Sequence, residues 1–222
     1  GSCGYFTKPR VMKIQTPSRH VLALTLVEVL VVLAMITLVA ILFLPGGHTY
    51  KVKKSDVGRL KCVSNLKQVT LSYKLFATDH NDLYPMQVST NEGGSLEFNG
   101  STDVFEYYRS LSNELYVPRV LVCPEDQGRT IATNFQADLR SNRNISYFVG
   151  LNAIDTQPGM FLTGDRYIAL NGKPLTGIQD LQPVDGLGWW TMGGHSEYGG
   201  GNVGLADGSV QSFSSEVLRD NL

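Results

Sequence analysis

Glu28 is a charged residue in an apolar segment, and its position needs a chemical explanation. It lies inside "LALTLVEVLVVLAMITLVAILFLP", residues 22–45, where every other residue is uncharged. A carboxylate in a lipid environment costs at least a few kcal/mol, so it needs a partner charge or a purpose. Residues 21–44 exceed the roughly 20 apolar residues that cross a bilayer core. We therefore expect a membrane-spanning helix with one acid near its start.

Three pairs of residues in the C-terminal half could do catalytic chemistry. They are His195 with Asp207, Ser196 with His195, and Asp165 with Arg166. A Ser-His-Asp triad needs convergent geometry, and no G-x-S-x-G or other nucleophile motif accompanies these residues. We therefore expect that this protein is not an enzyme. For His195 the sequence favours a hydrogen-bonded loop residue over a metal ligand, because no second His or Cys lies at ligand spacing.

The sequence gives little support for a metal site or for a site built on cysteine thiols. Asp79, Asn81 and Asp82 resemble the start of a calcium loop, but the Gly and the distal Glu of an EF-hand are missing. We expect no cofactor; calcium stays an open alternative with unknown ligands. No CxxC is present, so Cys62 and Cys123 are either a disulfide or two unrelated buried thiols. Our hypothesis is a disulfide that ties a helix to the C-terminal domain.

The composition fits one globular domain plus the apolar segment. The chain has 222 residues, of which 42% are hydrophobic and 18% charged, and its net charge is −1. These values are ordinary for a soluble domain and give no reason to expect nucleic-acid binding. Residues 1–23 hold four basic residues and no acid, and Met12 is a candidate start of the natural chain.

The elements that position these residues follow from local patterns. Pro45 and the two glycines after it should kink or end a helix. From Val57 to Phe76 apolar residues recur every three or four positions, which predicts an amphipathic helix ending near Asp79. Beyond it, "NISYFVGLNA" and "MFLTGDRYIALNG" are strand-like. "GNVGLADGSVQSF" predicts a hairpin that turns at Asp207-Gly208.

The segment "ALTLVEVLVVLAMI" resembles the processing and methylation motif of type IV prepilins and type II secretion pseudopilins. In that family a basic leader ends in a small residue, and an apolar residue, Thr, Leu, any residue and Glu follow. Ala23 matches the last leader position, where Gly is usual, and Leu24 the new N-terminus, where Phe is usual. Glu28 is then the fifth residue of the mature chain.

The resemblance continues beyond the apolar segment. "CVSNLKQVTLSYKLFATDHNDLYP" is similar to the passage from stem to head in a prepilin-like group that carries an H-X9-DG segment. "GGHSEYGGGNVGLADGSV" resembles that segment, with His195, Asp207 and Gly208 in the named places and eleven residues between them rather than nine. "LVCPED" and "GDR" also resemble this group.

The resemblance implies an α+β fold with a long N-terminal helix and a β-rich C-terminal globular head, the pilin-like lollipop. The expected organisation is a basic leader at 1–23 that is removed, a transmembrane and assembly helix at 24–45, an amphipathic stem helix at 46–80 and a β-rich head at 81–222. The expected location is a single pass of the inner membrane with the head in the periplasm, and then a pilus or pseudopilus filament.

The implied function is that of a structural subunit of a type IV pilus-like or type II secretion pseudopilus filament. Its partners would be a prepilin peptidase cutting between Ala23 and Leu24, copies of itself, other pilin-like subunits and an inner-membrane assembly platform. Glu28 would pair with the amino group of Leu24 of a neighbouring subunit. His195 would support the loop over the Asp207-Gly208 hairpin. The alternative is a non-polymerising single-span membrane protein whose extracytoplasmic head binds a ligand or partner.

Overall fold

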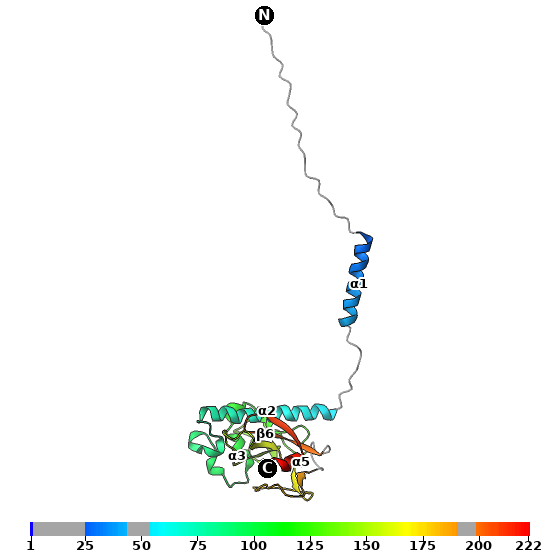
Figure 1. Cartoon of the computed structure of the whole chain (residues 1–222). Helices are drawn as coiled ribbons and strands as arrows, with labels where there is room; N and C mark the ends of the chain where they lie inside the picture. Colours follow the sequence, from blue (N-terminus) through cyan, green and yellow to red (C-terminus); the bar gives the residue numbers. More distant parts are fainter. Residues whose placement is uncertain (2–24, 44–53, 191–198) are drawn as a thin grey trace. The chain divides into compact units, whose positions relative to one another are not determined.

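The structure is a computed structural model that describes residues 1, 25–43, 54–190 and 199–222. The chain forms two compact units, Gly1–Lys51 and Val52–Leu222. Each unit is described by itself, and the second is called the head unit below. Figure 1 shows the helices and strands of both units.

The first unit contains one described helix, α1, Leu26–Phe43. It ends two residues before Pro45, as expected because the residue before a proline disfavours the helical conformation. The next helix, α2, begins only at Lys54. The prediction of one long N-terminal helix with a transmembrane half and a stem half is therefore wrong.

No helix within the described residues is both long and apolar enough to cross a membrane. The prediction of a single-pass protein of the inner membrane is therefore not supported by the structure.

Helix α2, Lys54–Asp79, is the longest described element of the head unit. One face carries Leu66, Val69, Tyr73 and Phe76, all buried, because residues three and four apart share one side of a helix. The helix ends at a cap in which the Asp82 N–H donates to Ala77 O (2.9 Å). This cap uses positive φ angles at Asn81 (55°) and Asp82 (61°).

The first half of the head unit is helical rather than β-rich. Between α2 and residue 147, where every residue is described, the chain makes only short helices and 3-10 turns. Prolines, glycines and asparagines interrupt this stretch every few residues, so no alternating run long enough for a strand develops. The elements are η1 (Pro85–Gln87), η2 (Thr90–Glu92), η3 (Leu96–Phe98), α3 (Val104–Arg109), α4 (Ser112–Leu115), η4 (Pro118–Leu121) and η5 (Asn142–Asn144).

The second half forms two antiparallel sheets, so the head unit is α+β. The larger sheet has the order β1-β2-β6-β7 and the smaller one β4-β3-β5. A short helix, α5, follows β7 directly. The bounds are β1 (Tyr147–Val149), β2 (Phe161–Asp165), β3 (Ile168–Leu170), β4 (Lys173–Pro174), β5 (Leu187–Trp189), β6 (Gly200–Leu205), β7 (Val210–Ser214) and α5 (Ser215–Asp220).

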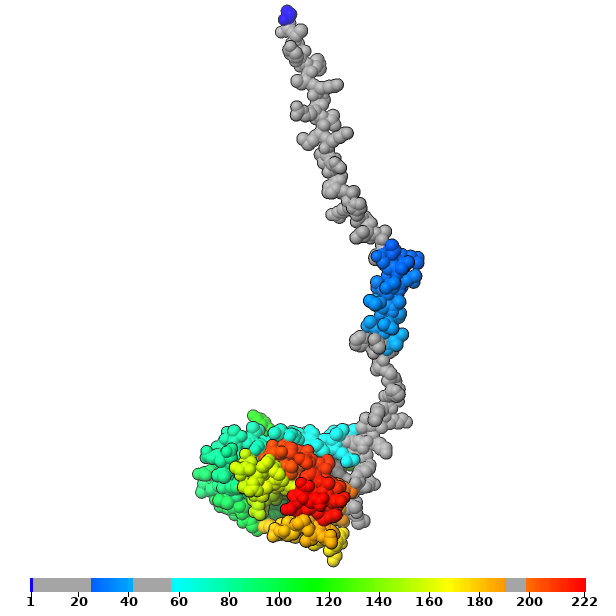
Figure 2. Space-filling model, viewed as in Figure 1, coloured from blue at the N-terminus to red at the C-terminus, as the bar shows by residue number. Residues whose placement is uncertain are grey.

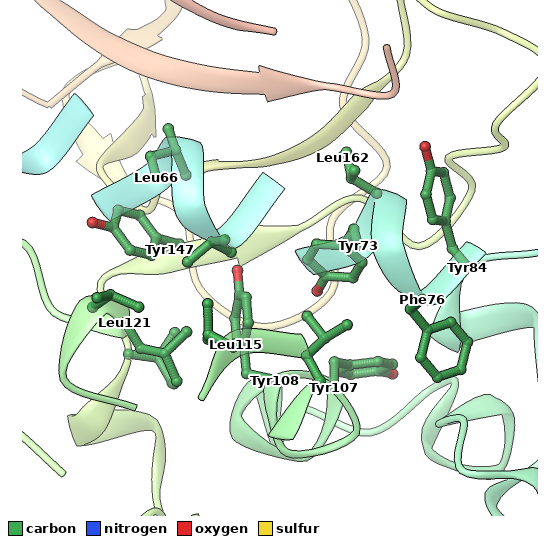
Figure 3. Close-up of a cluster of buried hydrophobic side chains, with 14 of the residues drawn as sticks. Leu66, Tyr73, Phe76, Tyr84, Tyr107, Tyr108, Leu115, Leu121, Tyr147 and Leu162 are labelled. Atoms are coloured by element: carbon green, nitrogen blue, oxygen red, sulfur yellow. The ribbon is translucent and has the colours of Figure 1, made fainter. Parts of the chain in front are cut away.

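The main core lies between α2, the larger sheet and the short helices. Figure 3 shows Leu66 and Tyr73 of α2 in one cluster with Tyr108 of α3, Tyr147 of β1 and Leu162 of β2. The helix crosses β6 at Gly204, where an added Cβ would overlap the Thr70 side chain of α2. A glycine is thus what allows helix and strand to approach so closely.

Candidate functional site

The predicted site residues fall into three groups. Ala23, Leu24 and His195 lie outside the described residues. Glu28 lies in the first turn of α1, the apolar helix of the first unit. The remaining four lie in the head unit, at two different places along α2. Cys62 and Cys123 lie at one of them, and Asp207 and Gly208 at the other.

Glu28 forms a capping box with Thr25 at the start of α1. Its carboxylate accepts hydrogen bonds from the Thr25 backbone N–H (2.8 Å) and hydroxyl (3.0 Å). The Glu28 N–H in turn donates to the Thr25 hydroxyl (3.3 Å). Backbone and side-chain hydrogen bonds from Thr25 lower the pKa of Glu28. The acid therefore satisfies donors at the N-terminus of its own helix, a role that needs no second subunit.

The surface of α1 is apolar in every direction. Its large apolar side chains from Leu26 to Ile41 are 44% to 77% exposed, and Glu28 is its only charged residue. The hydroxyl of Thr37 donates to Ala34 O of the same helix (2.9 Å), so its hydrogen-bond donor is satisfied within the helix. A helix that is apolar all round is normally buried in its native surroundings.

A disulfide joins Cys62 of α2 to Cys123, which follows η4. Both cysteines are buried, and they close a loop with a sequence separation of 61 residues. Nearby, the Asn65 side-chain amide donates to Val122 O (3.1 Å). The 118–123 segment is therefore fixed to the N-terminal half of α2 by a covalent bond and a hydrogen bond.

The Asp207-Gly208 turn between β6 and β7 is held against α2. Gly208 has a φ of 84°, which favours glycine, and Asp207 Oδ1 accepts from the Ser209 N–H (2.7 Å). Lys67 donates to Gly208 O (2.6 Å), and the Tyr84 hydroxyl donates to Ala206 O (2.7 Å). The hydrogen bonds from Ser209 lower the pKa of Asp207. This part of the family-like segment serves to dock the hairpin on the helix.

A buried ion cluster links two short sequences that we noted without assigning them a role. Asp126 of "LVCPED" accepts from Arg166 of "GDR" through Nε (2.9 Å) and Nη2 (3.0 Å), from Arg129 Nε (3.3 Å) and from the Tyr167 hydroxyl. Burial raises the pKa of Asp126, but the hydrogen bonds from Arg166 and Tyr167 outweigh it and hold that pKa below its ordinary value. Burial, with the neighbouring carboxylate, raises the pKa of Tyr167 to about 12.

Of the other catalytic candidates, Asp165 and Arg166 have structural partners, whereas Ser196 lies, like His195, outside the described residues. Arg166 is occupied by Asp126, and Asp165 accepts hydrogen bonds from the backbone N–H (2.8 Å) and the side-chain amide (2.9 Å) of Asn202 on β6. In the described part of the chain, no group of three or more His, Cys, Asp or Glu residues is placed to hold a metal ion. The pair of Asp165 and Arg166 is thus engaged in interactions with Asn202 and Asp126.

Comparison with known proteins supplies no relative. No protein-family model matches the chain, and no characterised protein and no solved structure matches it either.

Proposed function

We propose that this chain is a structural subunit of a type IV pilus-like or pseudopilus filament. In this proposal a prepilin peptidase cuts between Ala23 and Leu24, and the mature subunits polymerise through the N-terminal helix together with other pilin-like subunits. The observation that carries the proposal is α1, whose apolar side chains are exposed on all sides. Bundling with copies of the same helix would bury them, and each buried Leu, Val or Ile side chain contributes about 1.5–3 kcal/mol.

The resemblance at residues 23–36 supports the same reading. Cleavage would create a free amine at Leu24, four residues before Glu28. In a bundle, a subunit in register would bring its acid to the amine of a neighbour, whereas a subunit out of register would leave two unpaired charges. Glu28 would then exchange its bonds to Thr25 for an amine partner and act mainly on register.

Substitution of Glu28 separates these two roles. Glu28→Ala removes both the cap and the charge, whereas Glu28→Gln keeps the capping box, which accepts Glu or Gln at this position, and removes only the charge. We expect both variants to be processed normally. We expect incorporation into filaments beside a wild-type copy to fall about tenfold or more in both, equivalent to losing one hydrogen bond to a charged group.

The readout is the ratio of variant to wild-type subunit in sheared filaments, measured by mass spectrometry with whole-cell levels as the control. Normal incorporation of Glu28→Gln alone would reduce the role of Glu28 to helix capping. A wild-type chain that forms no filament would favour the alternative, a head that binds a ligand or partner without polymerising.

A further inference from the structure

His80, the residue that follows the end of α2, has a hydrogen-bond acceptor at each of its two ring nitrogens. Nδ1 lies 2.8 Å from Phe76 O in the last turn of α2, and Nε2 lies 3.2 Å from Glu92 O on η2. Backbone carbonyls only accept hydrogen bonds, and a neutral imidazole carries a single N–H. Only the imidazolium form, with a proton on each nitrogen, can therefore donate to both oxygens.

Helix α2 itself holds the ring in this orientation. The imidazole stacks on the Phe76 ring, with 3.8 Å between the ring centroids and 3° between the planes. The backbone N–H of His80 donates to Ala77 O (3.1 Å), and it is the His80 side chain that reaches Phe76 O. The last carbonyls of a helix lack helical partners, and the C-terminal end of a helix favours a positive charge. A protonated ring is therefore well suited to this position.

Each element that meets at this position carries a carboxyl group. Asp79 precedes His80, Asp82 lies in the turn that follows, Glu92 lies on η2, and Glu114 lies on α4, which packs against α2. Burial raises the pKa of Glu114, the charge of Asp79 raises it further, and the charge of His80 opposes both. Glu114 is therefore a second group near the end of α2 whose charge can change with pH, and a test must separate it from His80.

Glu92 lies in the tip of a loop, residues 89–94, most of which is exposed. Among the described residues, His80 gives this tip its one hydrogen bond to the chain outside the loop 85–98. The other hydrogen bonds of the tip are made within the loop itself. Figures 1 and 2 show this part of the chain, coloured between cyan and green, at one end of the head unit. The tip can therefore separate from α2 while the loop keeps its own structure.

We infer that His80 is a pH-sensitive latch, which holds the loop tip at the end of α2 when the ring carries two protons and releases it when one proton is lost. The proton that remains should stay on Nδ1, whose contact is the shorter one, so that the lone pair of Nε2 then faces Glu92 O. An imidazole ordinarily exchanges its second proton near pH 6.5. The closed tip is therefore favoured at acidic pH and loses this stabilisation as the pH rises through the range in which the ring is deprotonated. The latch does not depend on filament assembly.

Cleavage after Glu92 by a glutamate-specific protease measures the opening of the tip in the full chain. The cleavage rate is mapped by mass spectrometry at about pH 5.5 and about pH 8, on either side of the ordinary imidazole titration. It is divided by the rate at the same bond in a free peptide of residues 86–98, which removes the pH dependence of the protease. We expect this ratio to rise about tenfold from the lower to the higher pH, as for the loss of one hydrogen bond to a charged group. In His80→Gln, which cannot gain a proton, the ratio should be high and equal at both pH values.

Glu114→Gln is the matched control, because it neutralises the titratable neighbour on α4 and leaves His80 in place. Its ratio should still depend on pH, with the transition moved to lower pH because a negative charge near the imidazolium is lost. A pH dependence that persists in His80→Gln but vanishes in Glu114→Gln would overturn the latch, since Glu114 would then be the group that titrates.

The wild type alone provides a second check. The ¹⁵N shifts of the His80 ring should show the loss of the Nε2 proton over the same pH range in which cleavage after Glu92 increases. A ratio that is equal at both pH values in the wild type, or a ring that loses its proton in a different pH range from the opening, would also overturn the latch.

Discussion

Replacing Cys62 and Cys123 together by alanine should lower the free energy of unfolding of the head unit by about 4 kcal/mol. In the chain-entropy view, a crosslink that closes a loop of this length lowers the entropy of the unfolded state and so raises its free energy by about that much. The disulfide joins α2 to the segment after η4. Without it, these two parts of the unfolded chain would move independently of each other. Alanine avoids leaving a buried thiol or hydroxyl without a partner.

Urea denaturation of the wild type and of the double and single variants measures this effect. If the crosslink is the interaction lost, each single variant should be about as unstable as the double variant. Alkylation of the wild type without reductant should modify neither cysteine. Two alkylated thiols, or a double variant within about 1 kcal/mol of the wild type, would contradict the structural role of the disulfide.

Asp126→Ala should destabilise the head unit by about 3 kcal/mol, because it leaves the guanidinium groups of Arg129 and Arg166 without their carboxylate. Breaking a buried ion pair from one side costs about 3–5 kcal/mol, and we take the lower figure because Arg166 is one-third exposed. The carboxylate itself is 1% exposed. The backbone N–H of residue 126, which donates to Cys123 O (2.9 Å), is also present in alanine, so the substitution removes the side-chain interactions alone.

The pH dependence of this loss is determined by the lowered pKa of Asp126. A carboxyl group whose pKa is lower in the folded than in the unfolded state stabilises the fold above its ordinary pKa of 3.8, and loses that contribution as the pH falls through the folded value. The difference in unfolding free energy between the wild type and Asp126→Asn, a matched variant without charge, should therefore be constant near neutral pH and shrink below pH 3.8. A difference independent of pH would mean that the charge contributes nothing.

Local patterns account for much of α2 and of the β6-β7 hairpin. The three- and four-residue spacing from Leu66 to Phe76 matches the buried face of α2, and Asp207-Gly208 supplies the positive φ between β6 and β7. Both are interactions within a short stretch of chain. The sequence also contained a signal that we missed, since Thr25 and Glu28 have the T-x-x-E spacing of a capping box.

Features that depend on distant partners could not be predicted in this way. Asp126 and Arg166 are 40 residues apart, and nothing in the local pattern of either indicates the other. The helical first half of the head was wrongly predicted to be β-rich because its short turns are stabilised by packing on α2, which hydropathy periodicity does not report. The predicted membrane span is likewise not found, because no helix among the described residues, α1 included, is both long and apolar enough to cross a membrane.

The mass of the chain in a purified filament fraction tests the proposed function most directly. We predict that sheared filaments contain this protein beginning at Leu24, with or without one methyl group on the new amine, and that Ala23 and everything before it are gone. A chain found in filaments with residues 12–23 still attached, or one that is absent from filaments altogether, would contradict the proposal.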